Sequence, residues 1–253
     1  MATVISVTNQ KGGVGKTTST INIAYYLAKQ GKKTLIIDFD PQGNATSGLG
    51  FDKQDLKGTM VDVILEKKPL KAVILPTEHN NLFLAPTTPI LANTEVELAQ
   101  ATRRFTRLKN AIENIKDYDY VLIDCPPSLS LLTVNGLIAS RYVLLPVQAE
   151  FYALEGLGQL LETMKLIRKG MNPTLDLIGV LATMVDGRTS LSGQVLEEIK
   201  KHFPGKSFKS TIPRNVRLAE APSHGLPIGA YDRFSKGARA YKAVTKEVLE
   251  RVG

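Results

Sequence analysis

Short runs of apolar residues recur along the chain and alternate with longer stretches of mixed polarity. Five of these runs are apolar over nearly their whole length, at residues 3–8, 33–38, 120–125, 142–147 and 177–185. Strands buried on both faces of a parallel sheet show this pattern, whereas half-exposed strands alternate apolar and polar residues. We therefore predict that the five runs are strands of a parallel sheet.

Stretches of helical length lie between the predicted strands, at residues 16–30, 103–116, 152–169 and 190–203. Parallel strands need crossover connections of about a dozen residues or more, and helices of this length supply them. The sequence therefore predicts a doubly wound α/β fold with a mostly parallel sheet flanked by helices. In such sheets, ligands bind beyond the carboxyl ends of the strands.

Nothing in the composition divides the chain into parts. It has 253 residues, 43% of them hydrophobic and 22% charged, and it contains no Ser/Gly/Pro-rich linker, repeat or low-complexity run. A chain of this length can form one large α/β domain or two small ones, and the absence of a linker favours one. We expect a single domain over residues 1–253.

The cysteine content and the net charge indicate the cellular compartment and the class of binding partner. The single cysteine, Cys125, cannot form an intrachain disulfide, and we expect it to be a small buried residue. The start of the chain, MATVISVTNQ, lacks the features of a secretory signal, and no run of about 18 apolar residues is present. We expect a cytoplasmic protein without a membrane span. An excess of 32 basic over 24 acidic side chains, a net charge of +8, favours a polyanionic partner.

A glycine-rich segment, NQKGGVGKTTST at residues 9–20, joins the first predicted strand to the first predicted helix. The backbone N–H groups of such a loop, together with the helix N-terminus behind it, can bind phosphate oxygens. Lys16 would hold the β and γ phosphates, and the Thr17 hydroxyl would bind Mg²⁺. The sequence predicts a nucleotide site formed by Lys11, Gly12, Gly13, Val14, Gly15, Lys16, Thr17 and Thr18.

Acidic residues end two of the predicted strands. Asp38 and Asp40 close the segment LIIDFD, where an extended backbone would point alternate side chains to the same side. Asp124 ends the strand YVLID before two prolines, Pro126 and Pro127, which stop it. An aspartate at the end of a hydrophobic strand beside a phosphate loop is the arrangement that binds Mg²⁺, usually through water. We therefore predict that Asp124 belongs to a magnesium site.

The loop departs from the common G-x-x-x-x-G-K-[ST] pattern, because Gln10 stands where that pattern has its first glycine and Lys11 precedes the glycines. This K-G-G-x-G-K-T form resembles the ParA/MinD family of ATPases, and the resemblance covers nearly the whole chain. It implies that Lys11 reaches across a sandwich dimer to the partner's phosphates, where a cation would offset the repulsion between two anionic nucleotides. It also implies that Asp40 positions the attacking water and that Asp38 supports the magnesium shell. Lys11, Lys16 and Asp40 are then the expected catalytic residues.

Two later segments, DGRTS at residues 186–190 and STIPRNVRLAEAPSHGLPI at residues 210–228, resemble the chromosome-partition ParA (Soj) group. The resemblance implies that Pro213 and Asn215 lie at the nucleotide, with the part near Pro213 bordering the adenine. It further implies that Arg188 and Arg217 contact DNA without sequence preference. Other basic residues that would extend this patch are Lys200, Lys201, Arg214, Lys236, Arg239 and Lys242.

The function that the resemblance implies is a partition ATPase using ATP and Mg²⁺. Its ATP-bound homodimer would bind nonspecific double-stranded DNA of the nucleoid, and a ParB (Spo0J)-like protein would stimulate the hydrolysis that resets it. Only nine or so residues precede the phosphate loop, so we expect no operator-reading role through a helix-turn-helix domain there.

Two alternatives of the same fold stay open. A MinD-like, membrane-cycling ATPase would need an amphipathic C-terminal helix rich in bulky apolar residues. Here Ala240, Val244, Val248 and Leu249 form a modest apolar stripe, which we expect to pack on the sheet. The other alternative is an ATP-dependent biosynthetic ligase that phosphorylates a small carboxylate. An iron–sulfur relative of the nitrogenase iron protein type is excluded, since each subunit would need two ligating cysteines and the chain has one.

Overall fold

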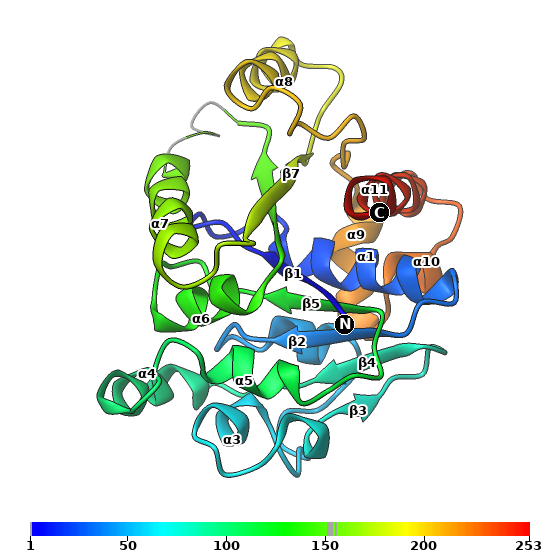
Figure 1. Ribbon diagram of the computed structural model, residues 1–253. Helices are drawn as coiled ribbons and strands as arrows, with labels where there is room; N and C mark the ends of the chain where they lie inside the picture. The colour runs from blue at the N-terminus through cyan, green and yellow to red at the C-terminus, as the bar shows by residue number, and fades with distance from the viewer. Residues whose placement is uncertain (1, 151–153, 155) are drawn as a thin grey trace.

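A seven-stranded sheet forms the centre of the computed structural model, which describes residues 2–150, 154 and 156–253 (Figure 1). The strand order is β3-β4-β2-β5-β1-β6-β7. Neighbouring strands are parallel except for β3 and β4, which pair antiparallel at one edge. The strands are β1 (Thr3–Val7), β2 (Thr34–Asp38), β3 (Leu75–Pro76), β4 (Leu82–Ala85), β5 (Tyr120–Asp124), β6 (Tyr142–Gln148) and β7 (Asp176–Thr183).

Helices cover both faces of the sheet, as the ribbon shows (Figure 1). One face packs against α1 (Lys16–Lys29), α10 (Ile228–Tyr231) and α11 (Lys236–Val252). The other face packs against a longer series of helices. These are α3 (Met60–Ile64), α4 (Leu91–Gln100), α5 (Arg107–Glu113), α6 (Leu131–Ala139), α7 (Leu157–Gly170) and α8 (Ser190–His202).

Short helical segments complete the chain and shape the loops at the strand ends. They are α2 (Asn44–Gly48), α9 (Val216–Glu220) and the 3-10 turns η1 (Leu70–Ala72) and η2 (Ala221–His224). Successive residues of each strand face opposite helical layers. In β2, for example, Ile36 joins the core under α1, whereas Leu35 and Ile37 join the core under α3 to α6. Burial on both faces is the reason why these strands read as continuous apolar runs.

All five predicted strands are present, with ends that move by one or two residues. The expected helix at 103–116 is shorter, as α5, and the expected helix at 152–169 begins only at Leu157 among the described residues. Residues 152, 153 and 155 of that prediction lie outside the described part. The sequence analysis missed β4, a four-residue strand that pairs parallel with β2, and α6, whose almost wholly apolar sequence hides its helical period.

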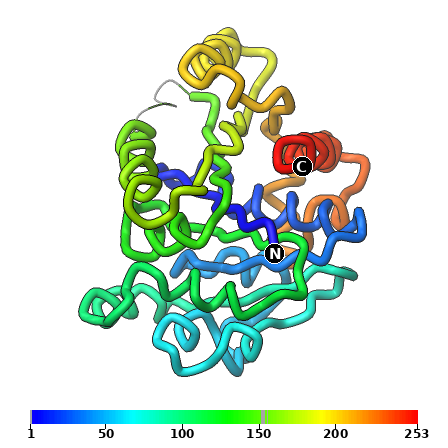
Figure 2. The backbone as a smooth tube through the Cα atoms, in the orientation of Figure 1, coloured from blue at the N-terminus to red at the C-terminus, as the bar shows by residue number. Residues whose placement is uncertain are grey.

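The C-terminal helix α11 packs mainly on α1 and also contacts β7, so the predicted packing on the sheet accounts for the smaller part of its contacts. The hydroxyl groups of Tyr241 and Ser19 lie 3.1 Å apart, and Val244 and Val248 are fully buried. Figure 2 shows the red C-terminal helix beside the blue helix that follows the first strand. The apolar stripe of α11 is therefore covered by the protein's own core, in which Leu249 is partly buried.

The carboxyl ends of the central strands meet at one edge of the sheet, and this edge positions the candidate site. Asp124 is the register partner of Val7 on one side and of Asp38 on the other, so the two aspartates end adjacent strands. Cys125, the next residue, is fully buried as expected. Burial raises the pKa of its thiol to about 12, which keeps it protonated at neutral pH.

Candidate active site

The glycine-rich loop turns sharply between β1 and α1. Gly13 and Gly15 have φ angles of 75° and 87°, in the left-handed region that favours glycine. A Cβ atom built at Gly12 or Gly13 would meet nothing within 4 Å, so the outer side of the loop is open. The base of the loop is fixed, because the Thr183 hydroxyl donates a 2.9 Å hydrogen bond to the Val14 carbonyl. The loop is thus anchored below and accessible above, as a phosphate cradle requires.

Lys16 begins α1, as the sequence predicted, and its side chain folds back over the loop. Its Nζ donates a 3.0 Å hydrogen bond to the carbonyl oxygen of Lys11. The residue is only 7% exposed, and this burial lowers the pKa of its ammonium group, against the opposing effect of Asp124 and Asp40. A largely desolvated cation held over the glycine-rich loop is suited to bind phosphate oxygens.

Lys11, the lysine before the glycines, extends in a different direction. Its Nζ lies 3.7 Å from Oε2 of Glu150, in the segment after β6. The other oxygen of Glu150 lies 3.6 Å from Nη2 of Arg214, a residue of the expected basic patch. The side chain of Lys11 is 40% exposed. The structure therefore separates the two lysines of the loop, with Lys16 inside the cradle and Lys11 outside it.

Thr17 and Asp124 are brought together, as the magnesium prediction requires. The Thr17 hydroxyl donates a 2.7 Å hydrogen bond to Oδ2 of Asp124, and the Thr20 hydroxyl lies 3.3 Å from Oδ1. Asp124 is fully buried. Burial, followed by the nearby charge of Asp38, raises the pKa of Asp124 well above its ordinary range. A cation at this position would oppose that shift, because a nearby positive charge favours the ionised carboxylate.

Asp38 presents one free carboxylate oxygen to the same region. Its Oδ2 accepts two 2.7 Å hydrogen bonds, from the backbone N–H and the hydroxyl of Thr46, whereas its buried Oδ1 has no partner among the described residues. Burial raises the pKa of Asp38 from its ordinary value of 3.8 to about 6. Carboxylate and hydroxyl oxygens are the ligands that Mg²⁺ takes, usually one or two of them together with phosphate and water. The oxygens of Asp38, Asp124 and Thr17 fit a magnesium ion.

Asp40 follows β2 and lies beside the same charges. It is 6% exposed, and its Oδ1 accepts a 3.0 Å hydrogen bond from the Gln42 N–H. Burial raises the pKa of Asp40, and the hydrogen bond and the charge of Lys16 oppose that change. Its carboxylate is thus placed next to the lysine of the cradle, where it can accept a hydrogen bond from a water near a bound phosphate.

The segment expected at the nucleotide base lies at the same edge of the molecule. Val185, just after β7, and Pro213 form an isolated parallel bridge, so the loops that carry them run side by side. Asn215 immediately precedes α9, and its buried Oδ1 lacks a hydrogen-bond partner in the described part of the chain. A free acceptor of this kind can read an amino group, such as the exocyclic amine of adenine.

Both arginines expected to contact DNA follow these two segments, Arg188 in the turn after β7 and Arg217 in α9, and both are engaged by carboxylates. Arg188 makes two hydrogen bonds to Asp186, at 2.9 and 2.7 Å, and these hold the pKa of Asp186 well below its ordinary range. Arg217 lies 2.9 Å from Glu220 and 3.7 Å from Asp232. The side chain of Arg188 is 88% exposed and that of Arg217 is 54% exposed, so both remain accessible to a ligand.

Several residues of the site were missed by the sequence analysis. Thr20 stands three residues after Thr17 on the same helix face, so helical spacing could have indicated it. Thr46, Thr183 and Glu150 reach the site from distant segments, and no local pattern marks them.

The fold and the loop together define the class. A parallel sheet that delivers a glycine-rich loop into a helix N-terminus, with an acidic residue ending the neighbouring strand, is the construction of P-loop nucleotide-binding proteins. Comparison with known proteins identifies the family within this class. A family model described as "AAA domain" matches residues 2–177.

Curated relatives match the chain over nearly its whole length. It is 52% identical over 249 residues to the sporulation initiation inhibitor protein Soj of Bacillus subtilis, covering 98% of each chain. It is 47% identical to the chromosome partitioning protein ParA of Myxococcus xanthus, covering 98% of this chain and 88% of the relative. The chain belongs to the ParA/Soj family of chromosome-partitioning ATPases.

Solved structures agree with this fold. Cobyrinic acid a,c-diamide synthase from Mycobacterium smegmatis, with bound ADP and magnesium, has a TM-score of 0.88 and 36% identity, covering 100% of this chain and 96% of that one. The septum site-determining protein MinD from Pyrococcus horikoshii, complexed with Mg-ADP, has a TM-score of 0.81 and 26% identity, covering 100% and 98%. No helix in the described part of this chain combines the length and apolar character needed to cross a membrane.

Proposed function

We propose that this chain is a nucleotide-timed DNA-binding switch. Each subunit binds ATP and Mg²⁺ at its phosphate loop, and two subunits close into a sandwich dimer. The dimer binds double-stranded DNA of the nucleoid without sequence preference. Hydrolysis, stimulated by a ParB-like protein, returns the subunits to the unbound state.

The observation that carries this proposal is the separation of the two lysines of the loop. Lys16 is buried in the cradle of its own subunit, whereas Lys11 leaves the cradle and, among the residues that the structure describes, pairs with the half-exposed Glu150. A surface ion pair of this kind is weak, about 0–1 kcal/mol. Lys11 is therefore free to exchange Glu150 for the phosphates of a second subunit, and ATP binding and dimer formation become one event.

The remaining residues divide the chemistry among them. Thr17, Asp38 and Asp124 would hold the magnesium ion, which supplies positive charge to the phosphoryl group during transfer. Asp40 orients the attacking water and accepts its hydrogen bond. Phosphoryl transfer depends mainly on such positioning and charge stabilisation, so no covalent intermediate on the protein is needed. Pro213 and Asn215 would border the base.

DNA contact is assigned to Arg188 and Arg217. Arg188 follows Val185 and Arg217 follows Pro213, and the bridge between Val185 and Pro213 joins these two segments next to the proposed base site, so a change at the nucleotide can reach both. Dimer formation doubles the basic surface, and the second patch then binds at a high effective concentration. This gain lets a dimer hold DNA that a single subunit releases.

Retention on nonspecific double-stranded DNA tests the proposal, with ATP, with ADP and without nucleotide, at two salt concentrations. We expect ATP-dependent, salt-sensitive retention that Lys11→Ala abolishes. Lys16→Ala should lose nucleotide binding itself. Retention that is the same in every nucleotide state would contradict the switch, and binding to anionic liposomes in place of DNA would favour a membrane-cycling ATPase.

A second candidate function is supported by the similarity to the Mycobacterium smegmatis synthase, at 36% identity. A ligase of this fold would activate a small carboxylate with ATP. Phosphate release that depends on an added carboxylate substrate such as cobyrinic acid, and not on DNA or a protein partner, would establish it. The higher identity to partition proteins, 52% and 47%, favours the switch.

A further inference from the structure

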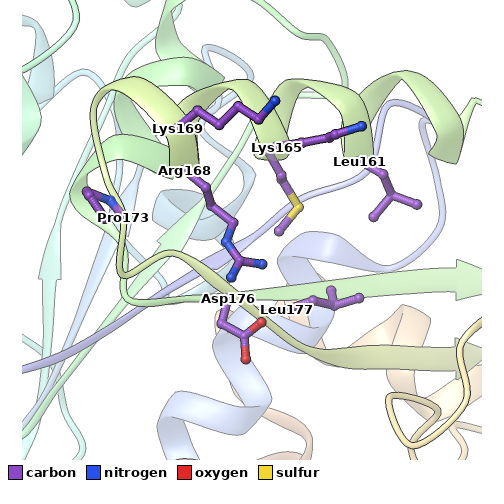
Figure 3. Close-up of a pocket in the computed structure, with 8 residues that line it drawn as sticks. Leu161, Lys165, Arg168, Lys169, Pro173, Asp176 and Leu177 are labelled. Atoms are coloured by element: carbon purple, nitrogen blue, oxygen red, sulfur yellow. The ribbon is translucent and has the colours of Figure 1, made fainter.

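A groove with basic side chains along its rim lies between α7 and the start of β7 (Figure 3). Its volume is about 450 Å³. In the close-up, Arg168 reaches from α7 toward Asp176 on β7, and Lys165 and Lys169 extend along the helix. None of these residues belongs to the nucleotide site or to the arginine-bearing loops.

The floor of the groove is apolar. Met164 and Leu177 are buried at its base, and Leu161 is half-buried beside them. On the outer surface of the same helix, Leu166 is 68% exposed. A charged rim over an apolar floor differs from an ordinary solvated helix face, which offers no apolar recess to a ligand.

Basic side chains outnumber acidic ones around the groove. Among the described residues that line it, Lys165, Arg168 and Lys169 are basic and Asp176 is acidic. Asp176 is already bound by Lys206, whose Nζ lies 2.9 Å from its Oδ2, and Lys165 has a 3.6 Å ion pair with Glu162 on its own helix. The rim therefore keeps positive charge available for an incoming anionic group.

The groove lies far from the proposed DNA contacts. Asp176 is the first residue of β7 and Thr183 the last, so the two ends of this eight-residue strand lie about 23 Å apart at ~3.3 Å per residue. Arg188 follows the far end of that strand. A ligand in the groove would leave the phosphate loop and the arginine-bearing loops uncovered.

We propose that the groove between α7 and β7 docks an acidic, amphipathic peptide segment of a partner protein. Carboxylates of the peptide would pair with Lys165, Arg168 and Lys169, and its apolar side chains would cover Leu161, Met164 and Leu177. DNA is the less suitable ligand, because a duplex presents phosphates and no apolar side chains to fill the floor. The partner could then remain attached while the protein binds nucleotide or DNA.

Fluorescence anisotropy with a labelled synthetic peptide tests this surface in the full-length protein. The probe is a 16-residue helix with Glu and Leu at helical spacing, and its control carries Gln at every Glu position. We expect saturable binding of the Glu peptide and no binding of the Gln peptide. A further peptide with Ser at every Leu position should bind about tenfold more weakly, since it cannot cover the floor.

The matched variants are Lys165→Glu/Lys169→Glu in the groove and Lys67→Glu/Lys116→Glu on exposed sites elsewhere. Both pairs change the net charge equally, and both should keep basal ATP hydrolysis and the circular dichroism spectrum of the wild type. We expect peptide affinity to fall at least about tenfold only in the groove pair. Equal affinity in the two pairs, or no binding of the Glu peptide to the wild type, would overturn the proposal. Loss of duplex DNA binding with unchanged peptide binding would also overturn it and make the groove a nucleic-acid surface.

Discussion

The hydroxyl of Thr17 donates a 2.7 Å hydrogen bond to Asp124, which ends the strand next to the phosphate loop. The two residues are 107 positions apart in the sequence. Their contact fixes the first turn of α1 against β5 and presents two oxygen atoms to one point. Asp38, the register neighbour of Asp124, adds a third.

Replacing Thr17 by valine removes the hydroxyl and keeps the shape of the side chain. We expect affinity for Mg-ADP, measured by isothermal titration calorimetry, to fall at least about tenfold, in line with the loss of a hydrogen bond to a charged group. Affinity for ADP in the presence of EDTA should stay the same. Thr17→Ser, which keeps the hydroxyl, is the control. An equal loss with and without Mg²⁺ would show that Thr17 acts on the loop and not on the cation.

Asp40→Ala should stop hydrolysis without preventing ATP binding. We expect phosphate release to fall by a factor of about 10² or more, because a positioned acceptor typically contributes that much. Light scattering after gel filtration should find a stable dimer with ATP. Asp52→Ala, at an exposed acid in a nearby loop, should behave as the wild type does. A monomeric Asp40→Ala variant in ATP would remove Asp40 from the role proposed here.

Arg217→Glu should separate DNA binding from dimer formation. The substitution reverses a charge that now lies beside Glu220 and Asp232, and the resulting cluster of carboxylates would repel phosphate. We expect the ATP dimer to persist and DNA retention to be lost. At low salt, the residual slope of log affinity against log salt should fall by about 0.9 for each phosphate contact removed. Normal retention, compared with a Lys116→Glu control, would refute the assignment.

Asp38 should make the stability of the nucleotide-free protein depend on pH. Burial raises the pKa of Asp38 from 3.8 to about 6, so the folded state binds its proton more tightly than the unfolded state does. This contribution favours folding below about pH 4 and is lost as the pH rises through about 6. Relative to Asp38→Asn, the wild type should lose about 2–3 kcal/mol of unfolding free energy between pH 4 and 7. Urea titrations at a series of pH values measure this, and parallel curves for the two proteins would contradict it.

Gly225→Ala tests the close approach of the backbone at Gly225 to that at Gly50, and Gly31→Ala is its control. Both glycines have left-handed φ angles, 66° and 79°, but only a Cβ atom at Gly225 would collide, 2.6 Å from the Cα atom of Gly50. Each substitution should cost about 1–2 kcal/mol for the backbone conformation. Gly225→Ala should cost a further ~1–3 kcal/mol from overpacking. Urea unfolding compares the two, and equal losses would mean that the loop at Gly50 moves aside.

The sequence predicted those parts of the fold in which local pattern and tertiary setting agree. The five buried strands were predicted from their uniform hydrophobicity. The loop from Lys11 to Thr18 was predicted from its glycines and lysines. β4 and α6 were missed because a four-residue strand has too little sequence to show a pattern, and a helix enclosed by the core has no polar face. The observed strand boundaries differ from the predicted ones by one or two residues, because strand ends such as Val7 are set by pairing with a neighbouring strand.

The sequence predicted only those site residues that a local sequence pattern marks. Asp38, Asp40 and Asp124 stand out as acids at the ends of apolar strands. Thr46, by contrast, is an ordinary loop threonine in the sequence, yet it supplies both hydrogen bonds to Asp38. The pairing of Arg217 with Glu220, three residues further along α9, could have been predicted from helical spacing, whereas the contacts of Arg217 with Asp232 and of Arg188 with Asp186 depend on how the turns between the elements fold.

The contact between Ser19 and Tyr241 joins residues that are 222 positions apart in the chain. During synthesis at ~5–20 residues per second, the outer side of α1 would wait about 10–45 s for the helix that covers it. Until then, the phosphate loop is attached to a helix with part of its apolar surface in water. A chain stalled before α11 would therefore have the whole glycine-rich loop attached to a helix that its own core does not yet cover.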